Sequence, residues 1–439
     1  MKPAPTPTAT ITLAPWRGAV DLSARTFSQL TQRAHGWHRA ISDIPFSVLK
    51  HIPVVREFST PVRALHDGIT DAVYTAVDLT GSTVLSATTQ VMQQVERSPL
   101  APTLPAWRIE ATRAISAISG FVGDDMATRR NPLTPKLGFY LHNQRLELKP
   151  EPLRAAYPDA SQRLAVFVHG LCCEEHVWHE AAKPAPDCVS LIDALRARGY
   201  TPVFARYNSG LHISQNGRGL ARALGKLVTH WPRPVDEIVL IGHSMGGLVS
   251  RACAHSGLQQ QAAWTHKVSH IFCIGSPHRG APLEQLVHRS IPTLKRWGLT
   301  RPLAHILQVR SAGIKDLRSG TLHDGDWRGC DLDAVTSVED SAAAISDRAH
   351  HLAPRNTIAR IPTARYHFIG STLSQTPDNL LSRTLGDGIV DLPSATAAEL
   401  ADASTATLTR VHHLRLLNHP LVWQWMQRCL DEAGAPHRP

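Results

Sequence analysis

The 439-residue sequence has few cysteines, few aromatic residues (6%) and no long apolar segment. Its seven cysteines are odd in number and widely spread, which argues against a disulfide framework and favours a reducing compartment. No stretch reaches the roughly 18 uncharged apolar residues of a membrane span, and the N-terminus lacks the apolar block of a secretory signal. We therefore expect a cytoplasmic protein, and peripheral contact with a membrane remains an open alternative.

The sequence also lacks a concentration of charge of one sign. Lys and Arg number 46 and Asp and Glu number 36, a net charge of +10, of which residues 1–150 carry +5 (16 basic minus 11 acidic). An excess spread so evenly is not the basic arm or stripe that binds nucleic acid, so we expect no nucleic-acid partner. Hydrophobic residues make up 43% of the chain, which is enough apolar material for a sizeable core.

The first 130 residues have helical periodicity. Residues 1–14 are rich in Pro, Thr and Ala and are expected to be disordered. Between positions 69 and 95, and again between 107 and 122, apolar residues recur at steps of three and four, which predicts two helices that bury these stripes. We expect a helical N-terminal region, residues 1–130, before a second domain.

From residue 131 to 439, strand-like and helix-like segments alternate. The segment 138–150 alternates like a hairpin around Asn143 and Gln144. Strands are then predicted at 163–170, 200–208, 236–242, 266–276, 365–371 and 405–411, with helices at 188–199, 217–230, 245–258 and 419–431. Such alternation predicts a mostly parallel sheet with helices on both faces. Polar, Pro- and Arg-rich sequence interrupts the pattern at about 281–360, which we interpret as an inserted cap.

One motif offers a nucleophile. Gly242, His243, Ser244, Met245 and Gly246 fit the G-x-S-x-G pattern, in which the serine lies on a sharp turn between a strand and a helix. The context fits, because an apolar strand is predicted to end at Gly242 and a helix to begin at Met245. Ser244 is the candidate nucleophile, and an ordinary glycine-rich turn is the alternative.

An oxyanion hole is expected beside it. His169 and Gly170 end the first long parallel strand, and the loop that follows this strand supplies one backbone N–H to the oxyanion in hydrolases of this kind. The residue after the nucleophile supplies the other. The candidate donors are the N–H groups of Leu171 and Met245.

A carboxylate and a histidine must follow the serine in chain order. Asp387 lies in a Gly-Asp-Gly loop after the strand that ends near residue 371, and Asp391 is the fallback acid. The histidine belongs after the last strand, where His413, His412 and His419 are candidates in that order. Neighbouring residues that leave a strand point to opposite sides, so His412 and His413 cannot both face the serine.

A metal site is the competing interpretation of one segment. Potential metal ligands lie close together in residues 172–180, among them Cys172, Cys173, His176, His179 and Glu180. Adjacent cysteines point apart, however, and the spacing does not match H-E-x-x-H. We expect no metal and no other cofactor.

Seven segments together resemble a known family. They are VFVHGL (166–171), RYNSGLHISQNGR (206–218), VLIGHSMGGLVSRA (239–252), IGSPHRGAPLE (274–284), SAGIKDLRSG (311–320), GDGIVDLPSA (386–395) and HHLRLLNHPLVW (412–423). The chain resembles the α/β-hydrolase superfamily, and within it bacterial lipase/esterase-like proteins related to the GPI inositol-deacylase (PGAP1-like) domain. The resemblance covers about residues 135–435. It implies a catalytic Ser244, Asp387 and His413, with oxyanion N–H groups from Leu171 and Met245.

The sequence therefore predicts a serine hydrolase that cleaves carboxylic, lipid-like esters through an acyl-enzyme, with a small-molecule or lipid ester as its partner. An acyltransferase would use the same triad with an alcohol or thiol in place of water. A non-enzymatic protein, recruited by its N-terminal helices to a membrane or a partner, is the alternative from another class.

Overall fold

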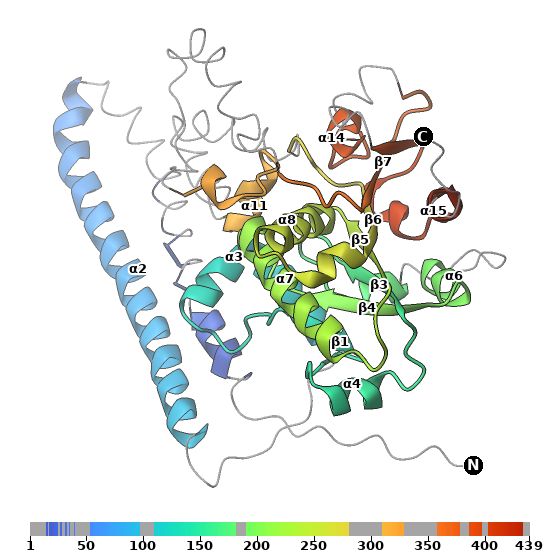
Figure 1. Cartoon of the computed structure of the whole chain (residues 1–439). Coiled ribbons are helices and arrows are strands. Elements are labelled where there is room, and N and C mark those ends of the chain that lie inside the picture. The colour runs from blue at the N-terminus through green and yellow to red at the C-terminus, as the bar shows by residue number, and fades with distance from the viewer. Residues whose placement is uncertain are drawn as a thin grey trace, which may run out of the picture. The chain divides into compact units, whose positions relative to one another are not determined.

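The structure, a computed structural model, describes residues 53–96, 109–180, 190–280, 310–328, 358–377, 386–396 and 403–432, together with part of 15–39; for 53–66 it describes the helical backbone alone. The chain divides into two compact units (Figure 1). One comprises Met1–Glu110, Met126–Thr134 and Val287–Val309, and the other comprises Ala111–Asp125, Pro135–Leu286 and Arg310–Pro439. The predicted boundary at residue 130 stays a prediction.

The first unit contains a long helix, α2 (Pro53–Glu96). Its packed face carries Gly81, which lies under the ring of Phe27, and Tyr74, which stacks on His35 with ring centroids 4.9 Å apart. Three residues of the predicted apolar stripe are not buried: Val77, Val84 and Val91 are about half exposed or more (47%, 60% and 59%). The expectation of burial was wrong at these positions; the other side chains of the stripe, Ile69, Val73 and Val95, lie outside the described residues.

The second unit contains an eight-stranded sheet in the order β2-β1-β4-β3-β5-β6-β7-β8. The strands are β1 (Gly138–Leu141), β2 (Gln144–Arg145), β3 (Arg163–Val168), β4 (Tyr200–Arg206), β5 (Glu237–His243), β6 (Val268–Ile274), β7 (Arg365–Thr372) and β8 (Ser404–Thr409). The strands β4-β3-β5-β6-β7-β8 pair in parallel, and β1 is antiparallel to both of its neighbours. All carboxyl ends of the parallel strands therefore lie along one edge, where loops from distant parts of the sequence meet.

Helices cover both faces of this sheet (Figure 1). The helices are α3 (Ile109–Thr128), α4 (Pro150–Ala156), α5 (Val177–Glu180), α6 (Leu191–Ala197), α7 (Ile213–His230), α8 (Met245–Gln259), α11 (Ala312–Leu317), α14 (Leu392–Thr396) and α15 (Pro420–Glu432), with 3-10 turns at Ala263–Lys267, Asp324–Asp326 and His413–Asn418. Along β3, Leu164 and Val166 pack with α7 and α8, whereas Ala165 and Phe167 pack with α6 and α15. This alternation between two apolar cores confirms the predicted parallel sheet with helices on both faces.

The predicted hairpin is present, but its turn is one residue earlier than expected. β1 and β2 pair around His142 and Asn143, both of which have positive φ (49° and 64°). Two consecutive residues of positive φ make the tight turn whose twist matches that of the two strands. The turn places Asn143 where its side chain accepts a hydrogen bond from Arg206 on β4.

Helix α3 buries small residues more deeply than its predicted apolar stripe, in which Ala111, Ile115 and Val122 are partly buried. Ile118 is 41% exposed, whereas Ser119, Gly120 and Gly123 are buried. A Cβ at Gly123 would lie 2.0 Å from the side-chain oxygen of Asn208, so the helix contacts its neighbour through small residues. A hydrophobicity pattern does not detect such a face, because glycine and serine contribute little to it.

The described part of the proposed cap is its centre. Residues 281–309 and 329–357, including the apolar positions Leu303, Ile306 and Leu307, lie outside the described residues, as do residues 1–14. The remaining apolar residues, Ile314 and Leu317, are buried on α11.

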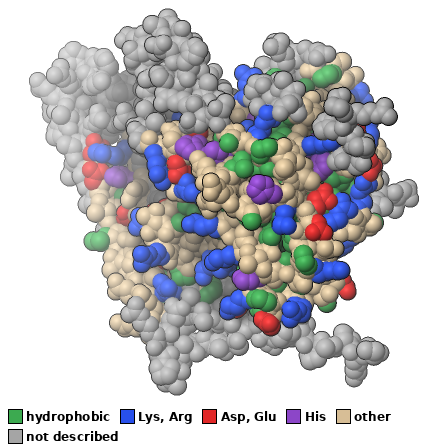
Figure 2. All heavy atoms as spheres, viewed as in Figure 1, with side chains coloured by type: hydrophobic (Ala, Val, Ile, Leu, Met, Phe, Trp, Pro, Cys, Tyr) green, Lys and Arg blue, Asp and Glu red, His purple; other side chains and the backbone are tan. Residues whose placement is uncertain are grey.

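Two surface properties complete the description. Among the described helices, none is both long enough and apolar enough to cross a membrane. On the face that Figure 2 shows, Lys and Arg side chains are scattered over the described surface and do not gather into one stripe.

Candidate active site

Ser244 lies on the turn between β5 and α8. Its backbone has φ 54° and ψ −125°, which is a strained conformation for a residue with a side chain. The strain follows from the reversal of the chain directly after a buried strand, which leaves the side chain at the carboxyl edge of the sheet. Ser244 N–H donates to the carbonyl of Ile274 (2.8 Å), and this bond holds the turn against the end of β6.

Two glycines make this turn possible. A Cβ at Gly246 would lie 2.1 Å from the carbonyl oxygen of Val168, and one at Gly242 would lie 2.4 Å from the carbonyl of Gly246. Both contacts are with backbone, which cannot move aside as a side chain can. The first turn of α8 therefore packs directly on the end of β3, and the G-x-S-x-G spacing has a steric cause here.

Asp387 lies in the loop after β7 with its carboxylate fully buried. One oxygen, Oδ1, accepts hydrogen bonds from the backbone N–H groups of Ile389 (3.1 Å) and Val390 (2.9 Å). The other, Oδ2, lies 2.7 Å from Nδ1 of His413. Burial with three donors keeps the carboxylate satisfied and fixes its direction.

His413 begins the 3-10 turn after β8 and is 4% exposed. Its backbone N–H donates to the carbonyl of Asp387 (3.2 Å), and its Nδ1 contacts the carboxylate of the same residue. Because a carboxylate only accepts, Nδ1 carries the proton and Nε2 presents a lone pair. An imidazole held in this tautomer is suited to act as a base.

The other candidates occupy different places. His412 is exposed, which agrees with the expected opposite orientation of the two neighbouring histidines. His419 Nδ1 accepts from Leu421 N–H (3.3 Å) at the start of α15. Asp391 Oδ1 accepts from Ser394 N–H (2.6 Å) at the start of α14, and burial raises the pKa of the Asp391 carboxyl.

The ends of β5 and β6 bring the serine and histidine loops to one place. A Cβ at Gly275, which has φ 60° and directly follows the hydrogen-bond acceptor of Ser244, would lie 3.3 Å from Nδ1 and Cε1 of His413. The ring of His243, next to Ser244 in sequence, lies 4.8 Å from the ring of His413 between centroids. The structure thus joins Asp387 and His413 directly and places His243, the neighbour of Ser244, beside His413.

His169 determines the orientation of the peptide expected to serve the oxyanion. Its ring stacks on Tyr207 (4.3 Å), its Nε2 accepts from Tyr207 N–H (3.3 Å), and its Nδ1 lies 2.8 Å from the carbonyl oxygen of Gly170. Nδ1 therefore donates to Gly170, and burial lowers the pKa of His169 to about 4, so the ring is neutral. Because a peptide is planar and trans, fixing the Gly170 carbonyl points the Leu171 N–H in the opposite direction.

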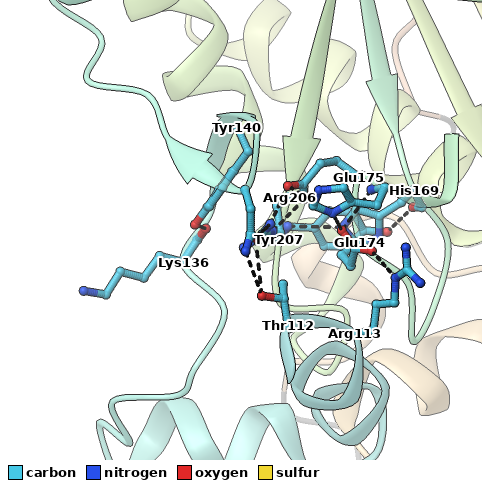
Figure 3. A network of polar contacts seen from close by, with 11 residues as sticks. Thr112, Arg113, Lys136, Tyr140, His169, Glu174, Glu175, Arg206 and Tyr207 are labelled. Atoms are coloured by element: carbon cyan, nitrogen blue, oxygen red, sulfur yellow. Dashed lines mark hydrogen bonds and ion pairs between the residues drawn. The ribbon is translucent and has the colours of Figure 1, made fainter. Parts of the chain in front are cut away.

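A network of buried charges holds the loop after β3, which contains Glu174 and Glu175 (Figure 3). Arg206 donates to the carboxylate of Glu175 through Nε (2.6 Å) and Nη2, and its guanidinium lies 3.9 Å from the ring centroid of Tyr140. Beside it, Glu174 Oε2 contacts Nδ1 of His176 (2.5 Å). Burial opposes the ionisation of Glu174, but the hydrogen bonds from His176 outweigh it and lower the pKa of that carboxyl. The same contact raises the pKa of His176.

This segment is where the sequence offered a metal site. Within the part of the chain that the structure describes, Glu174, Glu175 and His176 are the group whose ligand atoms lie within 4.8 Å of one another. Their charges are already compensated by Arg206 and by one another. Burial raises the pKa of the Cys172 and Cys173 thiols to about 11, so neither presents a thiolate. The side chain of Glu180 lies outside the described residues.

Comparison with known families supplies an independent observation. The model of the PGAP1-like alpha/beta domain matches residues 220–328, which include β5, the serine turn, α8 and β6. Residues 220–328 are thus similar to the PGAP1-like alpha/beta domain. The resemblance predicted from the sequence motifs is thereby confirmed, as is the α/β-hydrolase fold class, whose mostly parallel sheet carries the serine turn at its carboxyl edge.

Solved structures were also compared. Lipase BlEst2 of Bacillus licheniformis is 18% identical, with 67% of this chain and 97% of that chain covered and a TM-score of 0.38. Esterase B of Lactobacillus rhamnosis is 11% identical (74% and 96% covered, TM-score 0.33), and phospholipase PlaB of Legionella pneumophila is 14% identical (62% and 60% covered, TM-score 0.36). No curated protein matches the sequence.

Some residues of the candidate site were not found from the sequence. His243 occupies the variable position of G-x-S-x-G, Gly275 lies in the GSPH segment, and Ser209 accepts the N–H of Cys172 through Oγ (3.1 Å). Their contacts join segments that are distant in sequence. The histidine at the variable position of the serine motif was the one sequence signal that could have identified His243, and Gly275 and Ser209 had none.

Proposed function

We propose that this protein is a serine hydrolase that cleaves carboxylic esters through an acyl-enzyme on Ser244. The observation that carries the proposal is the buried pair of Asp387 and His413, held 2.7 Å apart beside the strained serine turn. A buried carboxylate, an imidazole in the Nδ1–H tautomer and a serine on a strained turn are the three groups that acyl transfer requires.

The proposed reaction has two halves. His413 Nε2 takes the proton of Ser244 as Oγ attacks the ester carbonyl, and the same imidazolium then protonates the departing alcohol. Water attacks the acyl-enzyme in the second half, again with His413 as base, and releases the acid and the serine. Asp387 stabilises the imidazolium in both halves.

The oxyanion that forms in each half needs donors. We assign this role to the N–H groups of Leu171 and Met245, because the Gly170 peptide is oriented by His169 and because a first-turn N–H of α8 has no acceptor within its own helix. One such donor contributes about 2.7–4 kcal/mol to transition-state stabilisation.

The substrate is proposed to carry an apolar acyl chain. Exposed apolar side chains lie on the loops that hold the acid and the base: Leu373 (48%), Ile389 (40%) and Leu414 (55%). Leu373 N–H donates to the carbonyl of Gly386 (2.8 Å), so these loops lie together. An apolar rim at the site favours lipid-like esters over short polar ones.

The test uses p-nitrophenyl esters of increasing acyl length and a serine-directed phosphonate. We expect hydrolysis and labelling by the wild-type protein, with kcat/KM rising from acetyl to octanoyl esters, and neither in Ser244→Ala. Loss of the nucleophile should lower kcat by roughly 10⁶-fold. Labelling at another serine would contradict the assignment, and an excess of a second alcohol in the assay would reveal transfer in place of hydrolysis.

A further inference from the structure

The histidine next to the candidate nucleophile contacts the candidate base. His243 ends β5 and is 1% exposed, and its Nε2 lies 3.2 Å from the backbone carbonyl oxygen of His413. The two rings are tilted by 46° with centroids 4.8 Å apart, and Trp178 packs edge-on against the other side of His243. The contact joins residues 170 positions apart in the sequence.

The contact with a carbonyl oxygen determines which nitrogen of His243 carries the proton. A carbonyl oxygen only accepts, so Nε2 of His243 must carry the proton, and its buried Nδ1 has no hydrogen-bond partner among the described residues. Burial, reinforced by the neighbouring His413, lowers the pKa of His243 to about 3. His243 is thus a neutral donor near neutral pH.

The hydrogen bond from His243 also holds His413 relative to Ser244, which the bonds to Asp387 do not do. Both the backbone N–H and the Nδ1 of His413 are bonded to Asp387, and that loop is joined to the end of β7 through Leu373. These bonds hold the base relative to the acid. The bond from His243 holds the base relative to β5, the strand that ends in the nucleophile.

We propose that His243 is a positioning residue, which donates its Nε2–H to the His413 carbonyl and thereby sets the base at its working distance from Ser244. This inference rests on the proposed function. It predicts an effect on the chemical step and not on substrate binding, because the side chain of His243 is 1% exposed and is therefore not available for contact with a substrate.

The experiment compares three substitutions at this position. His243→Leu should lower kcat by roughly 10- to 100-fold with KM changed less than about twofold, since a small misplacement of a reacting group can cost about 10²-fold. His243→Gln places an amide N–H near the position of Nε2 and should recover most of the loss. His243→Asn has the same amide on a shorter side chain, does not reach the carbonyl, and should remain low.

His367→Leu is the matched control, because it removes an equally buried histidine from β7 at a place remote from the serine turn and should leave kcat unchanged. All rates are measured well below the melting temperature of each variant, and circular dichroism checks folding. Equal kcat in the Gln and Asn variants, or wild-type kcat in a folded His243→Leu, would overturn the inference. If His243→Leu does not fold, the Gln–Asn comparison decides alone. A wild-type protein that phosphonate fails to label overturns the proposed function instead, and the inference with it.

Discussion

The two halves of the site are built in different ways. The nucleophile half consists of Ser244 and its neighbours in one continuous segment, and its shape comes from backbone packed against backbone at Gly242 and Gly246. The acid–base half consists of Asp387 and His413, which come from two loops 26 residues apart and are joined by hydrogen bonds. The first half is fixed by sterics, and the second by polar contacts in a buried place.

This difference determines how each half can fail. A steric arrangement fails when a side chain is too large, and the loss is one of stability and of the position of the turn. A hydrogen-bonded arrangement fails when a donor or acceptor is removed, and the loss is first one of catalysis, because the fold retains its apolar cores. The predictions below separate these two modes.

The largest effect is expected from removal of the base. His413→Ala should lower kcat by roughly 10⁶-fold, as for loss of the nucleophile, because the two groups act as one unit. The controls are His412→Ala, which removes an exposed ring, and His419→Ala, which removes a helix-start acceptor. Both should keep kcat/KM within about tenfold of wild type, or ~1.4 kcal/mol. Near-normal activity of a folded His413→Ala on a soluble ester would exclude the proposed triad.

The next largest effect concerns the acid. Asp387→Asn should lower kcat by roughly 10⁴-fold, because the amide favours the wrong imidazole tautomer and cannot stabilise the imidazolium. Asp391→Asn is the matched control, since asparagine caps a helix about as well as aspartate and α14 should be unaffected. Steady-state kinetics on both variants decide between the carboxylates. Greater damage from Asp391→Asn would mean that the wrong one has been assigned.

The contrast between the halves also explains what the sequence could predict. The serine turn was predictable because its residues are contiguous and its glycines are required by contacts within the motif and with β3. The sheet was predictable because each parallel strand is a buried apolar run, such as Ile238–Ile241 on β5. The pairing of Asp387 with His413 was predictable in chain order alone, and the two neighbouring histidines required the structure to separate them.

The contacts that the sequence did not predict are made by polar or small residues that are far apart in the sequence. His243 contacts the backbone carbonyl of His413, and His169 orients the backbone carbonyl of Gly170. Because every residue has a backbone carbonyl, the sequence does not show which of them will accept such a bond. The most buried positions of α3 include Ser119 and Gly123, which its apolar stripe did not indicate. Hydrophobic periodicity finds burial of large side chains only.

The steric half is tested by Gly246→Ala. The added Cβ would lie 2.1 Å from the Val168 carbonyl oxygen, so α8 must move away from β3. We expect a loss of about 1–3 kcal/mol in the free energy of unfolding, with a fall in kcat as the turn shifts. Gly225→Ala on α7 is the control, because its Cβ would meet only the Trp264 ring at 3.5 Å. That variant should gain about 0.5–1 kcal/mol from helix propensity. Equal urea midpoints for the two variants would contradict the steric account.

The smallest effect is a pH dependence of stability that originates at two buried histidines of the sheet. His270 on β6 and His367 on β7 are buried, and Nδ1 of the first lies 2.8 Å from Nε2 of the second. Burial lowers the pKa of His270 to about 4 and that of His367 to about 3. In the unfolded chain a histidine titrates near pH 6.5, so below that pH the unfolded state binds protons that the folded state does not.

The stability contributed by these neutral rings is therefore complete above about pH 6.5 and is lost as the pH falls toward 4. Each such histidine costs about 1.4 kcal/mol per pH unit in that window. His367→Phe keeps an aromatic ring between Phe272 and Trp425 but cannot be protonated. Urea unfolding at pH 7 and pH 5.5 should therefore show a drop in stability about 1 kcal/mol smaller in this variant than in the wild type. His412→Ala, which removes an exposed histidine, should leave the drop unchanged. The same drop in His367→Phe and the wild type would show that acid acts elsewhere in the molecule.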